Sequence, residues 1–118
     1  MSAIARDMID KTARLLIIGE YEEETRNLAD SLAADYQISA APTVADAAVR
    51  LQKEAFSAII LDLSDDESHL VRNLEALQQL SPNAPVIVIG PRHDSQLIVS
   101  AVKAGAFDFV TKPYPSEK

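Results

Sequence analysis

Cysteine is absent from this sequence of 118 residues, which excludes disulfide bonds, thiolate metal sites and cysteine nucleophiles. Basic residues are few: 11 lysines and arginines stand against 18 aspartates and glutamates, for a formal net charge of -7. A chain with this balance lacks the positive charge that attracts a nucleic-acid backbone or an anionic membrane surface. We therefore expect no direct nucleic-acid binding and no membrane binding.

Long apolar runs are missing as well. No segment approaches the roughly 20 apolar residues that span a bilayer. Residues 1–11 carry Arg6, Asp7 and Asp10, which interrupt the apolar stretch that a secretory signal needs. Hydrophobic residues make up 47% and charged residues 25% of the chain, which is typical of one soluble globular domain. The expected location is the cytoplasm.

Three short apolar runs predict buried strands. They lie at residues 14–18, 58–61 and 86–89, are rich in isoleucine, leucine and valine, and show no alternation with polar residues. Strands of this kind are buried on both faces and belong to parallel sheets that helices cover. Two weaker runs, at residues 37–40 and 106–110, complete a set of five predicted strands.

Helical spacing of apolar residues fills the segments between these runs. Helices are predicted over residues 23–35, after the capping sequence 43–46, over 70–81 and over 95–104, with Gly105 ending the last one. Alternating strands and helices predict a parallel α/β sheet with right-handed crossovers. We expect two helices on each face of this sheet.

The two ends of the chain leave alternatives open. A sheet with two helices on each face has room for one more, and residues 112–118 after the fifth strand are too few to supply it. Ile4 and Met8 fall on one helical face. Residues 1–12 are therefore either a helix that replaces the missing one or a frayed N-terminal extension. In a third interpretation, residues 13–118 are a domain that is truncated before its final helix.

Charged residues follow three of the predicted strands. Glu20 follows the first, Asp62 the third and Lys112 the fifth, and ligands of an open parallel α/β sheet bind beyond the carboxyl ends of its strands. This set suits phosphoryl transfer, because Mg²⁺ takes one or two carboxylates, an aspartate can act as nucleophile and a lysine contacts phosphate oxygens. The alternative is that these acids cap the N-termini of neighbouring helices.

Three segments resemble a known family. The sequence Ala-Val-Lys-Ala-Gly-Ala-Phe-Asp-Phe-Val-Thr-Lys-Pro at 101–113 resembles the fourth helix, the fifth strand and the Lys-Pro turn of bacterial response-regulator receiver domains. Residues 61–63 resemble the phosphoacceptor segment of that family, and residues 85–90 its fourth strand. The resemblance covers residues 13–115. It implies a flavodoxin-like, doubly wound parallel sheet of five strands in the order 2-1-3-4-5, with the last helix missing or replaced.

The resemblance also implies roles for single residues. Asp62 matches the aspartate that accepts a phosphoryl group from a histidine kinase or a phosphotransfer protein, and Lys112 matches the lysine that contacts this group. Phe109 matches the aromatic residue whose rotamer reports the active state. The carboxylates of Glu20 and Asp62, with the backbone carbonyl of Ser64, would bind Mg²⁺. The chain is therefore expected to be a phosphoacceptor and not an enzyme.

The chain departs from the family pattern at several positions, two of which bear directly on the site. The family carries two adjacent acids after the first strand, where this chain has Gly19 and Glu20. Gly90 stands where the family has a threonine or serine that contacts the phosphoryl group. We expect Mg²⁺ affinity to be lower by about ten- to a hundredfold, together with a weakened switch. The chain is either a phosphoacceptor in a two-component relay or a pseudo-receiver that binds a protein partner without phosphate. The partner surface would be the fourth helix and fifth strand, which could also form a homodimer.

Overall fold

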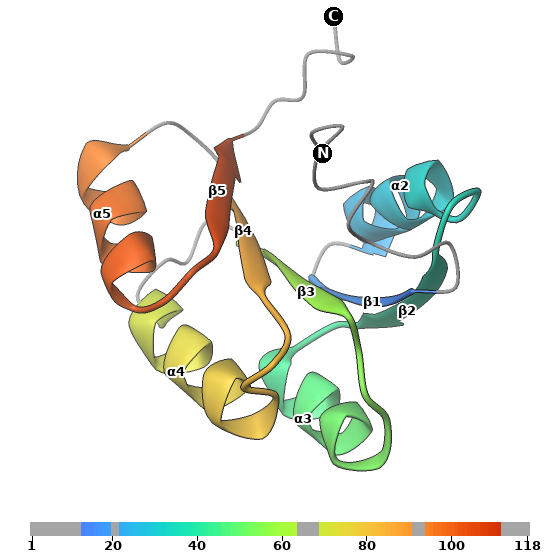
Figure 1. Ribbon diagram of the computed structural model, residues 1–118. Helices are drawn as coiled ribbons and strands as arrows, with labels where there is room; N and C mark the ends of the chain where they lie inside the picture. Colours follow the sequence, from blue (N-terminus) through green and yellow to red (C-terminus); the bar gives the residue numbers. More distant parts are fainter. Residues whose placement is uncertain (1–12, 20–21, 64–68, 91–93, 112–118) are drawn as a thin grey trace, which may run out of the picture.

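The computed structural model describes residues 13–19, 22–63, 69–90 and 94–111. Within these ranges five parallel strands form one sheet in the order β2-β1-β3-β4-β5 (Figure 1). They are β1 (Arg14–Ile18), β2 (Gln37–Ala41), β3 (Ala58–Asp62), β4 (Val86–Gly90) and β5 (Asp108–Thr111). This result confirms the predicted flavodoxin-like sheet and its strand order.

Four helices connect the strands of the described part. They are α2 (Glu22–Leu32), α3 (Val44–Lys53), α4 (Leu70–Leu80) and α5 (Ser95–Lys103). Each predicted helix is present, with ends within three residues of the predicted ones. No helix in the described ranges combines the length and apolarity of a membrane span. Residues 1–12 and 112–118 lie outside these ranges, so the alternatives for the two ends of the chain stay predictions.

The helices divide unequally between the two faces of the sheet. Side chains from α3, α4 and α5 share a core with one face, whereas α2 packs on the other (Figure 1). The expectation of two helices on each face was therefore wrong. The chain moves one way across the sheet from β1 to β2 and the opposite way at every later crossover. Because all the crossovers are right-handed, only the first helix lies on the opposite face from the rest.

Alternate residues of each strand enter two separate cores. The larger core lies between the sheet and α3, α4 and α5, and its buried strand residues are Leu16, Ile18, Ala41, Ile59, Leu61, Val86 and Val88. Their neighbours on the other face, Ile17, Ile60 and Ile89, pack against Leu28 and Leu32 of α2. Burial on both faces explains why these strands are continuous apolar runs.

Local capping fixes where α3 and α5 begin and end. The Thr43 hydroxyl accepts a hydrogen bond from the Asp46 backbone N–H at 3.1 Å, as the capping sequence predicts. Asp94 caps α5 in the same way. Gly105 follows α5 with φ of +103°, a conformation that favours glycine and confirms the predicted stop. These caps set the positions of the helices around the sheet.

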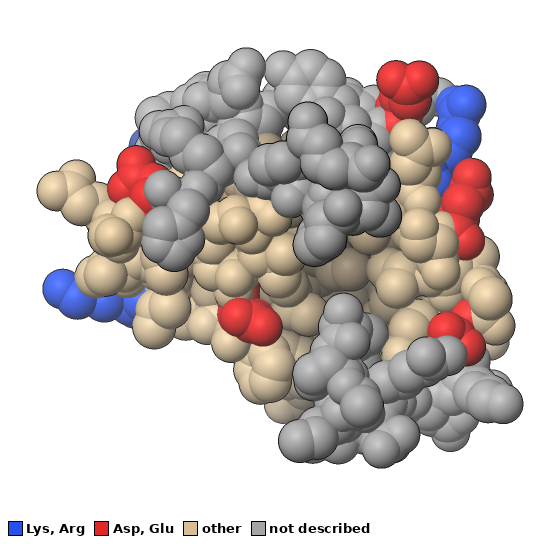
Figure 2. Space-filling model, turned by 90° about the horizontal axis from the view of Figure 1, so that it is seen from above, with Lys and Arg blue, Asp and Glu red and all other residues tan. Residues whose placement is uncertain are grey.

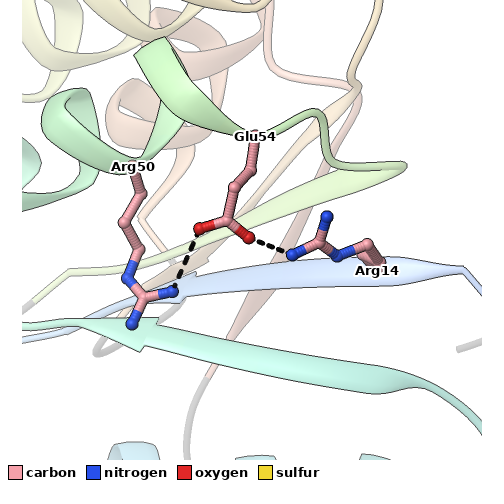
Figure 3. A network of polar contacts seen from close by, with 3 residues as sticks. All are labelled: Arg14, Arg50 and Glu54. Carbon is pink, nitrogen blue, oxygen red and sulfur yellow. Dashed lines mark hydrogen bonds and ion pairs between the residues drawn. The ribbon is translucent and has the colours of Figure 1, made fainter.

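A polar network joins the beginning of β1 to the end of α3 (Figure 3). The Glu54 carboxylate binds Arg14 through one oxygen and lies 3.6 Å from Arg50 Nη1 through the other. The Arg14 guanidinium also lies 5.3 Å from the centre of the Phe56 ring, in cation–π range. Arg14 opens β1, so the network lies at the end of the parallel sheet opposite to its carboxyl edge. Its role is to hold β1 and α3 together.

Candidate functional site

Asp62 lies at the carboxyl edge of the sheet. It is the last residue of the fully buried strand β3, and only 9% of it is exposed. Its side chain borders a hollow of about 270 Å³ between the carboxyl ends of β1 and β3 and the first turn of α3. Ile18, Gly19 and Thr43 are among the other residues that line this hollow. The predicted phosphoacceptor is therefore at the edge where ligands of this fold bind.

Gly19 lies directly beside Asp62. A Cβ atom built on Gly19 would overlap the Thr25 hydroxyl oxygen, and it would lie 3.3 Å from Asp62 Cβ and 3.6 Å from Asp62 Oδ2. The space that an acidic side chain at residue 19 would need is thus filled by Thr25. The sequence shows that the acid is missing at residue 19, but it does not show which residue occupies the place of that acid. The signal was present, because Thr25 falls on the same helical stripe as Leu28 and Leu32.

Gly90 shows the same relation to Phe109. A Cβ atom on Gly90 would lie 2.8 Å from Phe109 Cε1 and 3.3 Å from Cε2, and closer still to Cζ. The ring is half-buried and packs against the larger core. Phe109 therefore occupies the volume in which a side chain of residue 90 would lie. The hydroxyl that the sequence lacks at this position could not be accommodated with the ring in this rotamer.

Three predicted site residues, Glu20, Ser64 and Lys112, lie outside the described ranges. The meeting of two carboxylates and a lysine, and the complete Mg²⁺ ligand set, therefore stay predictions. Across residues 13–19, 22–63, 69–90 and 94–111, no three histidine, cysteine, aspartate or glutamate residues are grouped as a metal site would need. Of the predicted metal ligands, the structure places Asp62.

Charged side chains are dispersed on the upper face of the molecule. Figure 2 shows acidic and basic side chains side by side at one edge of this face and an acidic side chain near its middle, with no gathering of lysines and arginines among the described residues. A phosphoryl group that approached this face would need its counter-charge from a cation or from residues outside the described ranges.

Large apolar side chains are exposed on α5 and around the edge strand β5, which lie together at one side of the molecule (Figure 1). We call them the α5–β5 edge, which consists of Val99, Val102, Phe107 and Val110. Phe107 is 69% exposed and Val102 57%. Exposed apolar groups of this size on neighbouring elements are common at protein–protein contacts. The edge lies on the helix and strand that were predicted to bind a partner, and its binding role stays a prediction.

Comparisons with known proteins agree with this architecture. A family model described as the response regulator receiver domain matches residues 15–118. Chemotaxis protein CheY of Thermotoga maritima is 28% identical over 103 residues, which cover 86% of each chain. An NtrX-like response regulator of Rickettsia bellii is 30% identical over 107 residues, but the chain spans only 22% of that protein's length.

Solved structures show the same fold. A two-component response regulator from Clostridium difficile superposes with a TM-score of 0.80 at 18% identity, over 90% of this chain and 88% of that one. A response regulator protein from Burkholderia pseudomallei has a TM-score of 0.78 at 26% identity, over 89% and 62%. The latter structure contains a phosphorylated aspartic acid, a calcium ion and citrate. Strand order, the aspartate that ends β3 and the family match agree, and the chain belongs to the response regulator receiver domain family.

Proposed function

We propose that this chain accepts a phosphoryl group on Asp62 and acts as the receiver in a two-component relay. The donor is a histidine kinase or a phosphotransfer protein, and the chain is a phosphoacceptor rather than an enzyme. The observation that carries the proposal is a nearly buried aspartate at the carboxyl end of β3 that opens into a hollow. A cytoplasmic location, without direct nucleic-acid or membrane contact, accords with the net charge of -7.

The transfer is a displacement at phosphorus. One Asp62 carboxylate oxygen attacks the phosphorus of a phosphohistidine, a P–O bond forms while the P–N bond breaks, and the released imidazole takes up a proton. The product is an acyl phosphate. Asp62 is nearly buried and borders the hollow, so the burial of Asp62 limits the directions from which a donor can approach its carboxylate.

Magnesium fits the donor set at this position. Mg²⁺ binds one or two carboxylates together with carbonyl oxygens and waters, and Asp62 supplies a carboxylate beside a hollow with room for water. Glu20 and the Ser64 carbonyl are the other predicted ligands. The bound ion would supply the positive charge that offsets repulsion between the carboxylate and the phosphoryl group. Gly19 contributes no acid, so we propose weakened metal affinity.

The contact between Gly90 and Phe109 favours a second candidate function. A ligand shifts a conformational equilibrium only through contacts that differ between the two states. Gly90 has no side chain with which to make such a contact, and the Phe109 ring already fills the space above it. We therefore propose a weakened switch. If the switch is lost completely, the chain is a pseudo-receiver. It then binds a protein partner, or a second copy of itself, through the α5–β5 edge without phosphate.

Intact mass spectrometry tests the first function against the second. The protein is incubated with acetyl phosphate and Mg²⁺, and its mass is compared with that of the Asp62→Asn variant. Asp30→Asn is the matched control, because Asp30 is an exposed aspartate on α2. The proposal predicts one added phosphoryl group in the wild type and in Asp30→Asn, and none in Asp62→Asn. If the wild type forms no adduct after prolonged incubation, the phosphoacceptor function is excluded and the pseudo-receiver function is favoured.

A further inference from the structure

The hydroxyl of Thr25 is buried without a partner. Thr25 lies in α2 with 5% of its surface exposed, and its Oγ1 makes no hydrogen bond within the described part of the chain. Ser31 on the same helix behaves in the usual way, because its hydroxyl donates to the Asn27 carbonyl at 3.0 Å. A buried hydroxyl that lacks such a bond is unfavourable. Thr25 therefore needs a partner from outside its own helix.

The Asp62 carboxylate is the neighbour that can supply this partner. The Thr25 oxygen and Asp62 Oδ2 both lie close to the position that a Cβ atom on Gly19 would occupy, Oδ2 at 3.6 Å from it. Both oxygens therefore border the small space that the missing side chain of residue 19 leaves open. The last side-chain bond of aspartate has a broad torsional preference, so the carboxylate can turn toward a donor across this space.

We propose that Thr25 is a positioning residue of the phosphoacceptor site, whose hydroxyl donates a hydrogen bond to the Asp62 side chain. This inference rests on the proposed function of Asp62. The hydroxyl takes over part of the space that the family pattern gives to an acid at residue 19, but it brings a neutral donor where that acid would bring a negative charge. Thr25 therefore stabilises negative charge on Asp62 without adding any of its own.

The consequence is a shorter lifetime of the acyl phosphate. In hydrolysis a water attacks phosphorus, the bond from phosphorus to the Asp62 oxygen breaks, and its electron pair returns to the carboxylate while inorganic phosphate and a proton leave. Negative charge then spreads over both Asp62 oxygens. A hydrogen bond to a charged acceptor is about twice as strong as one to a neutral carbonyl. The Thr25 hydroxyl therefore stabilises the departing carboxylate more than the acyl phosphate and accelerates hydrolysis.

Decay of the adduct measures this effect. Wild type, Thr25→Val and Thr25→Ser are phosphorylated with acetyl phosphate and Mg²⁺, the donor is removed by desalting, and the remaining adduct is followed by intact mass. Valine keeps the shape and removes the donor, so the adduct should last about five- to tenfold longer. Serine restores the donor and should return the lifetime toward that of the wild type. Ser31→Ala, which removes a hydroxyl from the same helix, should leave it unchanged.

The direction of the change separates this role from a structural one. Damage to the site would slow formation of the adduct together with its decay, whereas loss of this hydrogen bond alone should slow decay without slowing formation. An unchanged or shortened lifetime in Thr25→Val overturns the inference. If that variant does not fold, Thr25→Ala is measured in its place, with the same expected direction.

A second measurement does not need phosphorylation. A double-mutant cycle of Thr25→Val and Asp62→Ala, followed by urea unfolding, should show coupling of about five- to tenfold in the unfolding equilibrium constant. Additive effects overturn the inference. If the wild type forms no adduct, the proposed function fails and this cycle alone decides whether Thr25 and Asp62 interact.

Discussion

Replacing Gly90 with alanine introduces one methyl group into the volume that the Phe109 ring occupies. The added Cβ would lie 2.8 Å from Cε1 and 3.3 Å from Cε2, whereas carbon atoms in ordinary contact are about 3.5–4.0 Å apart. The φ angle of Gly90 is not positive, so alanine is compatible with the backbone. The perturbation therefore acts on the ring alone, which must shift within the core or turn outward.

The two responses of the ring have similar costs. Overpacking a core costs about 1–3 kcal/mol. Turning out a half-buried phenylalanine forfeits about half of the 1.5–3 kcal/mol that full burial provides. Alanine recovers about 0.5–1 kcal/mol relative to glycine within a strand. Because the ring takes the cheaper response, we expect a net loss of up to about 1 kcal/mol in the free energy of unfolding, and a melting temperature lower by up to about 4 °C.

A double-mutant cycle with Phe109→Ala isolates the contact. Urea unfolding is followed by circular dichroism, because the chain contains no tryptophan. Without the ring, Gly90→Ala should be neutral or stabilising by up to about 1 kcal/mol. An equal loss of stability in both backgrounds would refute the steric argument. Aromatic carbon NMR of Phe109 should also show a change of ring environment in Gly90→Ala, and an unchanged resonance would count against ring displacement.

Two further predictions concern the scaffold. Thr43→Ala removes the α3 cap, in which Oγ1 accepts from the Asp46 N–H at 3.1 Å, and should lower the free energy of unfolding by about 1 kcal/mol. Thr43→Ser keeps a capping hydroxyl and should retain most of the wild-type free energy of unfolding in the same urea titration. Equal losses in the serine and alanine variants would exclude the cap as the cause. Glu54→Gln removes the charge that binds Arg14 and Arg50 and should cost up to about 1 kcal/mol in low salt, because these side chains are partly exposed. The difference should shrink in about 1 M salt, and a salt-independent loss would contradict an electrostatic origin.

Asp62 could be located from the sequence because its position follows from local pattern. The run at 58–61 is apolar at every residue, which only a strand covered on both faces requires, and an aspartate directly after it falls at the carboxyl edge. The end of α5 at Gly105 could also be predicted from the sequence, because the left-handed conformation after a helix favours glycine. Both predictions rest on neighbours in the chain, where sequence and conformation are directly linked.

The amino-acid sequence by itself determined the elements, their order and the aspartate at the end of β3, because periodicity and capping act over a few residues. Only the tertiary structure decided that α2, among the described helices, lies on the opposite face of the sheet from the other three. It also decided that the Thr25 hydroxyl fills the space beside Gly19 and that the Phe109 ring fills the space above Gly90. Periodicity indicates which way a side chain faces. Which residues that side chain contacts depends on how separate elements pack and on which rotamer the packing selects.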